Sequence, residues 1–331
     1  MLGVKLQVKC GEELSESFQT DTGGPQGDSS SANEFTFYLA KALDDYYNMR
    51  RPTPQQHDHN YSKPQQIFTN TDHDYCKSTP KEHFQVDMQY ADDISELNTN
   101  YLDIDHLKKH LPKKLKDKRD LNLNQKKTEE YKISAKSNLW KLCKFLGSFI
   151  DTVKDIVSRK GKAIEAANEI DEIFRNKKLP ISVKIDAFNV YVGSVFLYNS
   201  ELWTLTKTMN EQIDAFHRRL LRKYVLNTRY PKIVTNTKVY EKTKTTTWSK
   251  IVGKRRITWF GHVNRLHEDT PARKALQYAL ADYTKRRGRP KLTWLKSVEK
   301  QLQEVGNIDE LITLAQDKGK WRDIVNSWYR K

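Results

Sequence analysis

The stretch from residue 84 to residue 96 most narrows the folds open to this chain, because it joins the alternation of a strand to a pair of adjacent acids. Every second residue from Phe84 to Tyr90 is apolar, which is the period of a half-buried strand. Asp92 and Asp93 come where this strand should turn, and Ile94 resumes the apolar positions, so the pattern predicts a tight hairpin with both carboxylates at its tip. Adjacent ionised carboxylates repel each other, and a divalent cation between them relieves that repulsion. An Asp-Asp turn on a surface hairpin accounts for the same residues without a metal.

The charge of the chain divides it into two parts of opposite sign. The 331 residues carry a formal net charge of +16. Residues 1–110 hold 10 Lys and Arg against 18 Asp and Glu, whereas residues 111–331 hold 48 against 24. An acidic front suits metal binding or catalysis, and a basic back of this size suits a polyanion. We therefore expect nucleic acid as the partner of the second part, with an ordinary basic, solvated surface as the alternative.

Cysteine usage and hydropathy indicate a nuclear or cytoplasmic protein. Cys10, Cys76 and Cys143 form neither a C-x-x-C pair nor a disulfide framework, which is typical of a reducing compartment and offers no zinc site. The sequence contains no apolar run of transmembrane length and no signal peptide. We therefore expect a protein that is neither secreted nor embedded in a membrane.

Short strands and helices are expected to alternate up to about residue 150. Glycine and proline are dense over residues 21–28, and Ser29 to Ser31 can cap a helix through Tyr38 and Leu43. After the Asp92-Asp93 hairpin, the patterns predict a helix over 102–111, a basic run over 113–119, a strand over 121–129 and an apolar hairpin over 142–150.

From about residue 155 the apolar spacing becomes helical. Ile164, Ala167, Ile170 and Phe174 fall on one helix face, and Pro180 ends that run. A long helical region is therefore expected to follow the strand-containing part of the chain.

A further helix is expected to begin with a capping box formed by Thr208 and Glu211. Its inward residues should be Ile213, Phe216, Leu220 and Tyr224. Its other face carries the cationic residues His217, Arg218, Arg219, Arg222 and Lys223. These side chains suit a phosphate backbone, and a solvated helix face explains them nearly as well.

With these pieces in order, the chain resembles part of the reverse transcriptase of a non-LTR (LINE-type) retrotransposon. Residues 24–28 (Gly-Pro-Gln-Gly-Asp) resemble the Pro-Gln-Gly block of the palm, and residues 90–93 resemble the Tyr-Ala-Asp-Asp box. Residues 124–129 are similar to the next motif, and residues 145–148 (Phe-Leu-Gly-Ser) are similar to the primer-grip hairpin. The helices from about 155 to 226 look like the thumb. The sequences Trp-Phe-Gly-His and Arg-Arg-Gly-Arg-Pro-Lys in the tail recur at the end of such reading frames.

The resemblance implies a two-metal nucleotidyl transfer in the intact family. Asp92 and Asp93 match two of the three catalytic aspartates and would be Mg²⁺ ligands, with two ions in the family. Lys127 would offset charge on the leaving pyrophosphate. RNA template, DNA primer and deoxynucleoside triphosphates are the implied partners.

The same resemblance implies binding roles for three further groups of residues. Pro25, Gln26, Gly27 and Tyr90 would contact nucleotide and template. Phe145, Leu146 and Gly147 would form the primer grip. Contacts to nucleic acid would come from Arg218, Arg219 and Arg222 of the helical region and from Arg286, Arg287 and Arg289 of the tail.

Departures from the family pattern predict that this chain is inactive as a polymerase by itself. The family's first catalytic aspartate lies upstream of the Pro-Gln-Gly block, and no matching motif stands before Gly24. The fingers are absent as well, and Ser30 and Ala32 stand where the family usually has Leu and Pro. Two carboxylates of three should bind the metal pair poorly, so we expect a truncated or degenerate copy.

The sequence thus predicts an α+β fold in three regions. Residues 1–150 are expected to form a partial palm with the primer-grip hairpin, residues 151–250 a helical thumb-like region, and residues 251–331 a basic, helical tail. One alternative is a non-catalytic nucleic-acid-binding protein that uses the basic C-terminal half; Arg287-Gly288-Arg289-Pro290 resembles an AT-hook core suited to a narrow A·T-rich minor groove. Another is a decayed reading frame whose product folds poorly.

Overall fold

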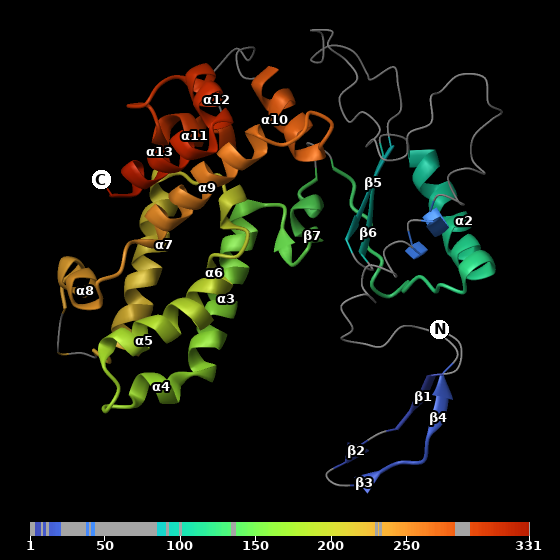
Figure 1. Cartoon of the computed structure of the whole chain (residues 1–331), viewed down its shortest axis with the longest axis horizontal. Helices are drawn as coiled ribbons and strands as arrows, with labels where there is room; N and C mark the ends of the chain where they lie inside the picture. Colours follow the sequence, from blue (N-terminus) through green and yellow to red (C-terminus); the bar gives the residue numbers. More distant parts are fainter. Residues whose placement is uncertain are drawn as a thin grey trace. The chain divides into compact units, whose positions relative to one another are not determined.

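The computed structural model confirms the α+β class, with short antiparallel ladders followed by a larger helical part (Figure 1). It describes residues 4–7, 9–10, 13–20, 38–39, 41–43, 85–90, 93–98, 101–133, 137–228, 231, 234–281 and 292–330. The chain divides into two compact units, residues 1–128 and 129–331, which are described separately below.

The strands described in the first unit pair two by two. The ladders join β1 (Val4–Leu6) to β4 (Phe18–Thr20), β2 (Lys9–Cys10) to β3 (Glu13–Leu14), and β5 (Gln85–Tyr90) to β6 (Asp93–Asn98), all antiparallel. The six residues of β5 coincide with the alternating stretch, as the period of two predicts.

Helix α2 (Tyr101–Arg119) is longer than expected and supplies much of the core of the first unit. We expected its end near Leu111, but the helix continues through Pro112 and includes the basic run. Leu111 and Leu115 are one turn apart, and both are buried against the helical residues Leu39 and Leu43. Burial of these leucines on one face outweighs the cost of an internal proline, and it confirms the predicted helix through Leu43 in the residues described there.

The second unit opens with a short hairpin and continues in helices. Its first elements are η1 (Leu139–Leu142), β7 (Lys144–Phe145), β8 (Ser148–Phe149), α3 (Thr152–Glu169), α4 (Asp171–Arg175), α5 (Ile181–Ala187), η2 (Phe188–Gly193), α6 (Ser194–Phe196) and η3 (Ser200–Leu202). They are followed by α7 (Lys207–Leu220), η4 (Leu221–Val225), α8 (Asn236–Thr243), α9 (Trp248–Asn264), α10 (Pro271–Ala281), α11 (Trp294–Gln301), α12 (Ile308–Gln316) and α13 (Lys318–Arg330). None of the helices that the structure describes is long and apolar enough to cross a bilayer.

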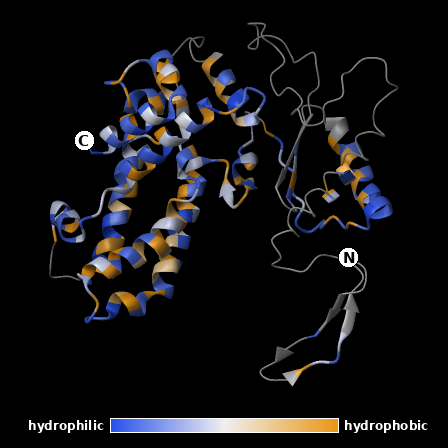
Figure 2. Cartoon of the chain, in the orientation of Figure 1, coloured by the Kyte–Doolittle hydropathy of each residue, from blue (hydrophilic) through white to orange (hydrophobic). Residues whose placement is uncertain are grey.

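Two hydrophobic cores hold these helices together, and α9 contributes to both. Its first turns place Trp248 and Val252 in a core shared with α3 to α8, and its later turns place Ile257 and Phe260 in a core shared with α10 to α13. Hydrophobic and hydrophilic residues alternate around these helices (Figure 2), as expected for amphipathic helices that bury one face. The helix therefore continues across residue 250, where we placed the limit between thumb and tail.

Glycines of α9 allow close packing of α13. A Cβ atom on Gly261 would lie 2.1 Å from Nε1 of Trp321, and one on Gly253 would lie 2.5 Å from the ring of Trp328. The two tryptophans are seven residues apart on α13 and the two glycines eight apart on α9, so each pair lies on one helix face. The Trp321 Nε1 atom also donates to the Ile257 carbonyl at 3.0 Å. The glycine of the Trp-Phe-Gly-His sequence thus has a packing role.

Helix α7 begins two residues earlier than the predicted capping box. Thr206 is the N-cap, and its hydroxyl accepts a hydrogen bond from the Met209 N–H at 3.2 Å. Thr208 lies inside the first turn, so the predicted capping box with Glu211 is wrong. Both threonines fit a cap by residue type, and burial of Ile213 and Phe216 fixes the phase of the helix.

Candidate functional site

The Tyr-Ala-Asp-Asp sequence lies at the turn of a β-hairpin. Tyr90 pairs with Asp93, and this is the last pair of the ladder between β5 and β6. The predicted hairpin is therefore confirmed. Asp93 is exposed as the first residue of β6, while Asp92 lies outside the described residues.

Two further residues of β6 set the environment of this hairpin. Ile94 packs against the core formed by α2 and residues 38–43, which fixes one side of the hairpin on the first unit. Burial raises the pKa of Glu96 to about 8.

The carboxylates that the structure describes do not by themselves make a metal centre. Across those residues, no three His, Cys, Asp or Glu side chains gather around one point. Carboxylate oxygens are suitable Mg²⁺ ligands, and exposed Asp93 is one such donor. The predicted roles of Asp92 and Asp93 as Mg²⁺ ligands remain predictions.

Lys127 lies in an exposed turn, and the strand predicted over residues 121–129 is not formed. The Asn124 carboxamide accepts a hydrogen bond from the Lys127 N–H at 3.3 Å, and the Asn124 carbonyl accepts from the Thr128 hydroxyl at 2.9 Å. A side chain that bonds to nearby backbone in this way competes with strand pairing. The ammonium group of Lys127 is exposed, and its contact with a nucleotide remains a prediction.

The second predicted hairpin, β7–β8, is confirmed and belongs to the second unit. Phe145 pairs with Ser148, and the two-residue turn places Leu146 at φ 47° and Gly147 at φ 77°. Two positive φ values are typical of a type I′ turn, which matches the twist of a hairpin. Phe145 and Leu146 are half-buried and Gly147 is exposed.

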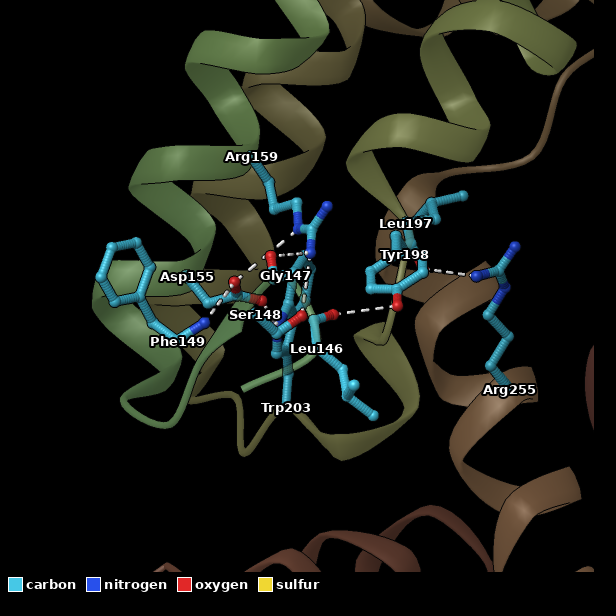
Figure 3. Close-up of polar contacts among 10 residues, drawn as sticks. All are labelled: Leu146, Gly147, Ser148, Phe149, Asp155, Arg159, Leu197, Tyr198, Trp203 and Arg255. Atoms are coloured by element: carbon cyan, nitrogen blue, oxygen red, sulfur yellow. Dashed lines mark hydrogen bonds and ion pairs between the residues drawn. The ribbon is translucent and has the colours of Figure 1, made fainter. Parts of the chain in front are cut away.

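A buried ion pair on α3 fixes this hairpin from one side (Figure 3). Asp155 accepts hydrogen bonds from the Phe149 N–H at 3.0 Å and from Nε1 of Trp203 at 2.8 Å. Arg159 lies 3.7 Å from the Asp155 carboxylate and donates to the Gly147 carbonyl at 2.7 Å and to the Ser148 hydroxyl at 2.8 Å. The Phe149 N–H and the Gly147 carbonyl are therefore both bonded to charged side chains of α3.

Tyr198 holds the turn from the other side. Its hydroxyl donates to the Leu146 carbonyl at 3.0 Å, and the Arg159 guanidinium lies 4.5 Å from the centre of its ring (Figure 3). The turn with the positive φ of Leu146 is therefore held by contacts from α3 and from the turn that follows α6.

The segment from Leu197 to Trp203 is in turn held by later helices. Arg255 donates to the Leu197 carbonyl, Arg256 donates to the Trp203 carbonyl at 2.7 Å, and Nε1 of Trp294 donates to the Glu201 carbonyl at 2.7 Å. Burial lowers the pKa of Arg256 to about 10. No sequence pattern indicated these contacts, because they join positions more than 50 residues apart.

The predicted cationic face of α7 is only partly a surface. His217 is 1% exposed, and neither ring nitrogen has a hydrogen-bond partner. Its ring stacks on Trp248 with centroids 4.4 Å apart, and burial, followed by the charge of Arg218, lowers its pKa to about 3. The prediction of His217 as a phosphate contact is therefore wrong, because the residue falls on the buried side of the helix.

The three arginines of this region have different environments. Arg222 donates to the Val234 carbonyl at 3.0 Å and to the Asn236 carboxamide at 2.7 Å, which braces the start of α8. Arg218 is half-buried, whereas Arg219 is exposed with its guanidinium 5.2 Å from the centre of the Phe216 ring. Of the three, Arg219 is the one that the structure leaves most open to a ligand.

Of the remaining predicted site residues, the structure describes Tyr90 alone. Tyr90 is described as the last residue of β5. The following lie outside the described residues: Pro25, Gln26, Gly27, Asp92, Arg286, Arg287 and Arg289. Their predicted contacts with nucleotide, metal and nucleic acid remain predictions.

Comparison with known proteins shows a similarity to a transposon-derived protein. The chain is 22% identical over 150 residues to a putative uncharacterized transposon-derived protein of Caenorhabditis elegans. The match covers 43% of this chain and 54% of the relative, so it spans about half the length of the curated protein. No protein-family model matches the chain. No solved structure matches it either.

Proposed function

We propose that this chain is the palm–thumb part of a non-LTR retrotransposon reverse transcriptase, and that by itself it binds a primer–template without extending it. One observation carries the proposal. Tyr90 and Asp93 of the Tyr-Ala-Asp-Asp sequence form the last pair of the β5–β6 ladder, and a second hairpin with the Phe-Leu-Gly-Ser sequence follows it in the order of the family. The similarity to a transposon-derived protein supports the same origin.

The geometry of the β7–β8 hairpin suits a surface that positions a strand. The Leu146–Gly147 turn has its carbonyls fixed by Tyr198 and Arg159, so the hairpin is held in one conformation before any ligand arrives. A site fixed in this way loses little conformational entropy on binding. We assign Phe145, Leu146 and Gly147 to contact with a primer strand.

Catalysis is not part of the proposal for this chain alone. In the intact family two Mg²⁺ ions activate the primer 3′-oxygen and neutralise the leaving pyrophosphate. Asp92 and Asp93 would hold such ions at the tip of β5–β6, and no residue before Gly24 matches the family's first catalytic aspartate.

The second candidate is a nucleic-acid-binding protein of no polymerase origin, favoured by the surplus of cations after residue 110. Fluorescence anisotropy with labelled ligands separates the two. We would compare an RNA–DNA primer–template, a plain mixed-sequence duplex and an A·T-rich duplex, each over a range of salt concentrations.

The proposal predicts tighter binding of the primer–template than of either duplex at every salt concentration. Equal affinity for all three, with a steep dependence on salt, would instead indicate sequence-indifferent phosphate binding. A preference for the A·T-rich duplex would indicate that Arg287 to Pro290 act as a hook.

A further inference from the structure

Two cations from different helices lie beside the same aromatic ring in the second unit. The Lys160 ammonium of α3 is 5.7 Å from the centre of the Phe216 ring, and the Arg219 guanidinium of α7 is 5.2 Å from it. Phe216 is 5% exposed and belongs to the first core of this unit. The Lys160 ammonium and the Arg219 guanidinium therefore both lie in cation–π contact with this ring, at the edge of the core.

These two charges lack a neutralising acid in the part of the chain that the structure describes. Neither Lys160 nor Arg219 takes part in an ion pair or a hydrogen bond there. Two acids of the same helices, Glu165 and Asp214, form no ion pair with them. Asp214 instead accepts from the Ser249 N–H at 2.9 Å and the Ser249 hydroxyl at 2.6 Å.

The positive charge of Lys160 is destabilised in the free protein. Lys160 is half-buried, and its pKa is lowered, first by burial and then by the positive charge of Arg219. An anion placed between the two cations would remove the repulsion and make charge-assisted hydrogen bonds with both.

A glycine next to Lys160 leaves the helix surface bare at this point. Gly161 lies in the interior of α3, where glycine costs roughly 0.5–1 kcal/mol relative to alanine. A Cβ atom on Gly161 would meet nothing within 4 Å, whereas the glycines of α9 are required by Trp321 and Trp328. Packing against the described residues therefore does not explain Gly161.

We propose that Lys160, Gly161 and Arg219 form a binding site for one phosphate group of a nucleic-acid strand. The site rests on the proposed function and deepens it, because it says where the strand contacts the helical region. Phosphate chemistry is shared by a nucleic-acid backbone, inorganic phosphate and a nucleoside triphosphate, and we assign the site to the backbone. Arg218 and Arg222 are not part of it.

The test uses the full chain and a labelled single-stranded oligonucleotide. Lys160→Gln and Arg219→Gln each remove one charge of the site, and Lys162→Gln removes one exposed charge from the same helix as the matched control. Each site variant should weaken binding about 3–10-fold at moderate salt and reduce the salt slope by about 0.7, the value for one phosphate contact on a single strand. The control should change affinity less than about twofold. Site variants that bind like the control would overturn the proposal.

The Gly161→Ala variant adds a readout that a structural role would not move. We expect a higher melting temperature by circular dichroism, because alanine favours the helix, together with weaker oligonucleotide binding. Binding that equals the parent's would exclude a close approach at Gly161 and overturn that part of the site.

Competition separates the sources of phosphate. We expect unlabelled oligonucleotide to displace the labelled strand, while inorganic phosphate and a deoxynucleoside triphosphate act only through ionic strength. Displacement by either small anion at submillimolar concentration would overturn the assignment to a backbone. If the chain showed no preference for primer–template but the site variants still weakened binding, the reverse transcriptase proposal would fall and this site would stand.

Discussion

His217 shows that helical phase decides the environment of a side chain regardless of its chemistry. It follows Ile213 by four positions and precedes Leu220 by three, so its ring enters the core, where it stacks on Trp248 and lies beside Phe188. A neutral imidazole can occupy such a place, but a protonated one cannot without a counter-ion.

The buried imidazole makes stability depend on pH. The pKa of His217 is about 3 in the folded protein and near 6.5 when exposed, so below pH 6.5 the unfolded chain binds a proton that the folded chain does not. The free energy of unfolding should therefore fall as pH drops from 6.5 toward 3, by up to about 1.4 kcal/mol per pH unit from this group.

The His217→Phe variant isolates this effect, because it keeps an aromatic ring in contact with the same neighbours. The stability difference between variant and parent should grow by roughly 2 kcal/mol in favour of the variant between pH 6.5 and pH 5. Urea denaturation at several pH values measures it, and other ionisable groups cancel in the comparison. A difference that stays constant with pH would show that His217 titrates normally in the folded state.

Two glycines offer a matched test of packing against propensity. Gly261→Ala forces a Cβ atom into the space of the Trp321 indole, so we expect a loss of about 1–3 kcal/mol of stability. Gly161→Ala meets no neighbour and should gain about 0.5–1 kcal/mol. Urea denaturation of both variants checks the signs, and a stable Gly261→Ala protein would refute the close packing of α9 and α13.

At the scale of elements, the periods of two and of 3.6 residues predicted β5 and the buried residues of α7 and η4. The face predicted over Ile164 to Phe174 is divided at Ile170, where α3 ends and α4 begins. Local hydrogen bonding decided where prediction failed. Asn124 forms a turn in place of a strand, and Thr206 replaces Thr208 as the cap. The hairpin β7–β8 could be predicted from its apolar residues and its Gly147. Its attachment to α3 could not, because nothing in the sequence distinguishes Asp155 and Arg159 from the exposed charged residues of a helix.

Asp155→Asn tests that attachment. The variant leaves Arg159 buried without its counter-ion and weakens the bonds to Phe149 and Trp203, so we expect a loss of roughly 3–5 kcal/mol. Asp171→Asn is the control, because its pair with Arg175 on α4 is largely exposed and should contribute less than about 1 kcal/mol. Thermal and urea unfolding compare the two. Equal losses would mean that the buried pair does not stabilise the hairpin.

At the scale of the whole molecule, the order of the strand and helix patterns predicted the α+β class. The sequence did not predict which helices of the second unit pack against one another. Helix α9 passes through two cores, and Arg255, Arg256 and Trp294 bind carbonyls of residues 197–203. Such contacts depend on tertiary packing, which a single sequence does not display. The hairpin that resembles a primer grip thus belongs to a helical unit that extends to the tail.

Primer extension tests the central claim most directly. An oligonucleotide-primed RNA template would be incubated with the parent chain and with Asp92→Asn, first with Mg²⁺ and then with Mn²⁺, and binding would be measured on the same substrate. The account predicts no extension by either chain and salt-sensitive binding of the primer–template by both. Extension by the parent that is lost in Asp92→Asn would contradict it, because another carboxylate would then complete the metal site.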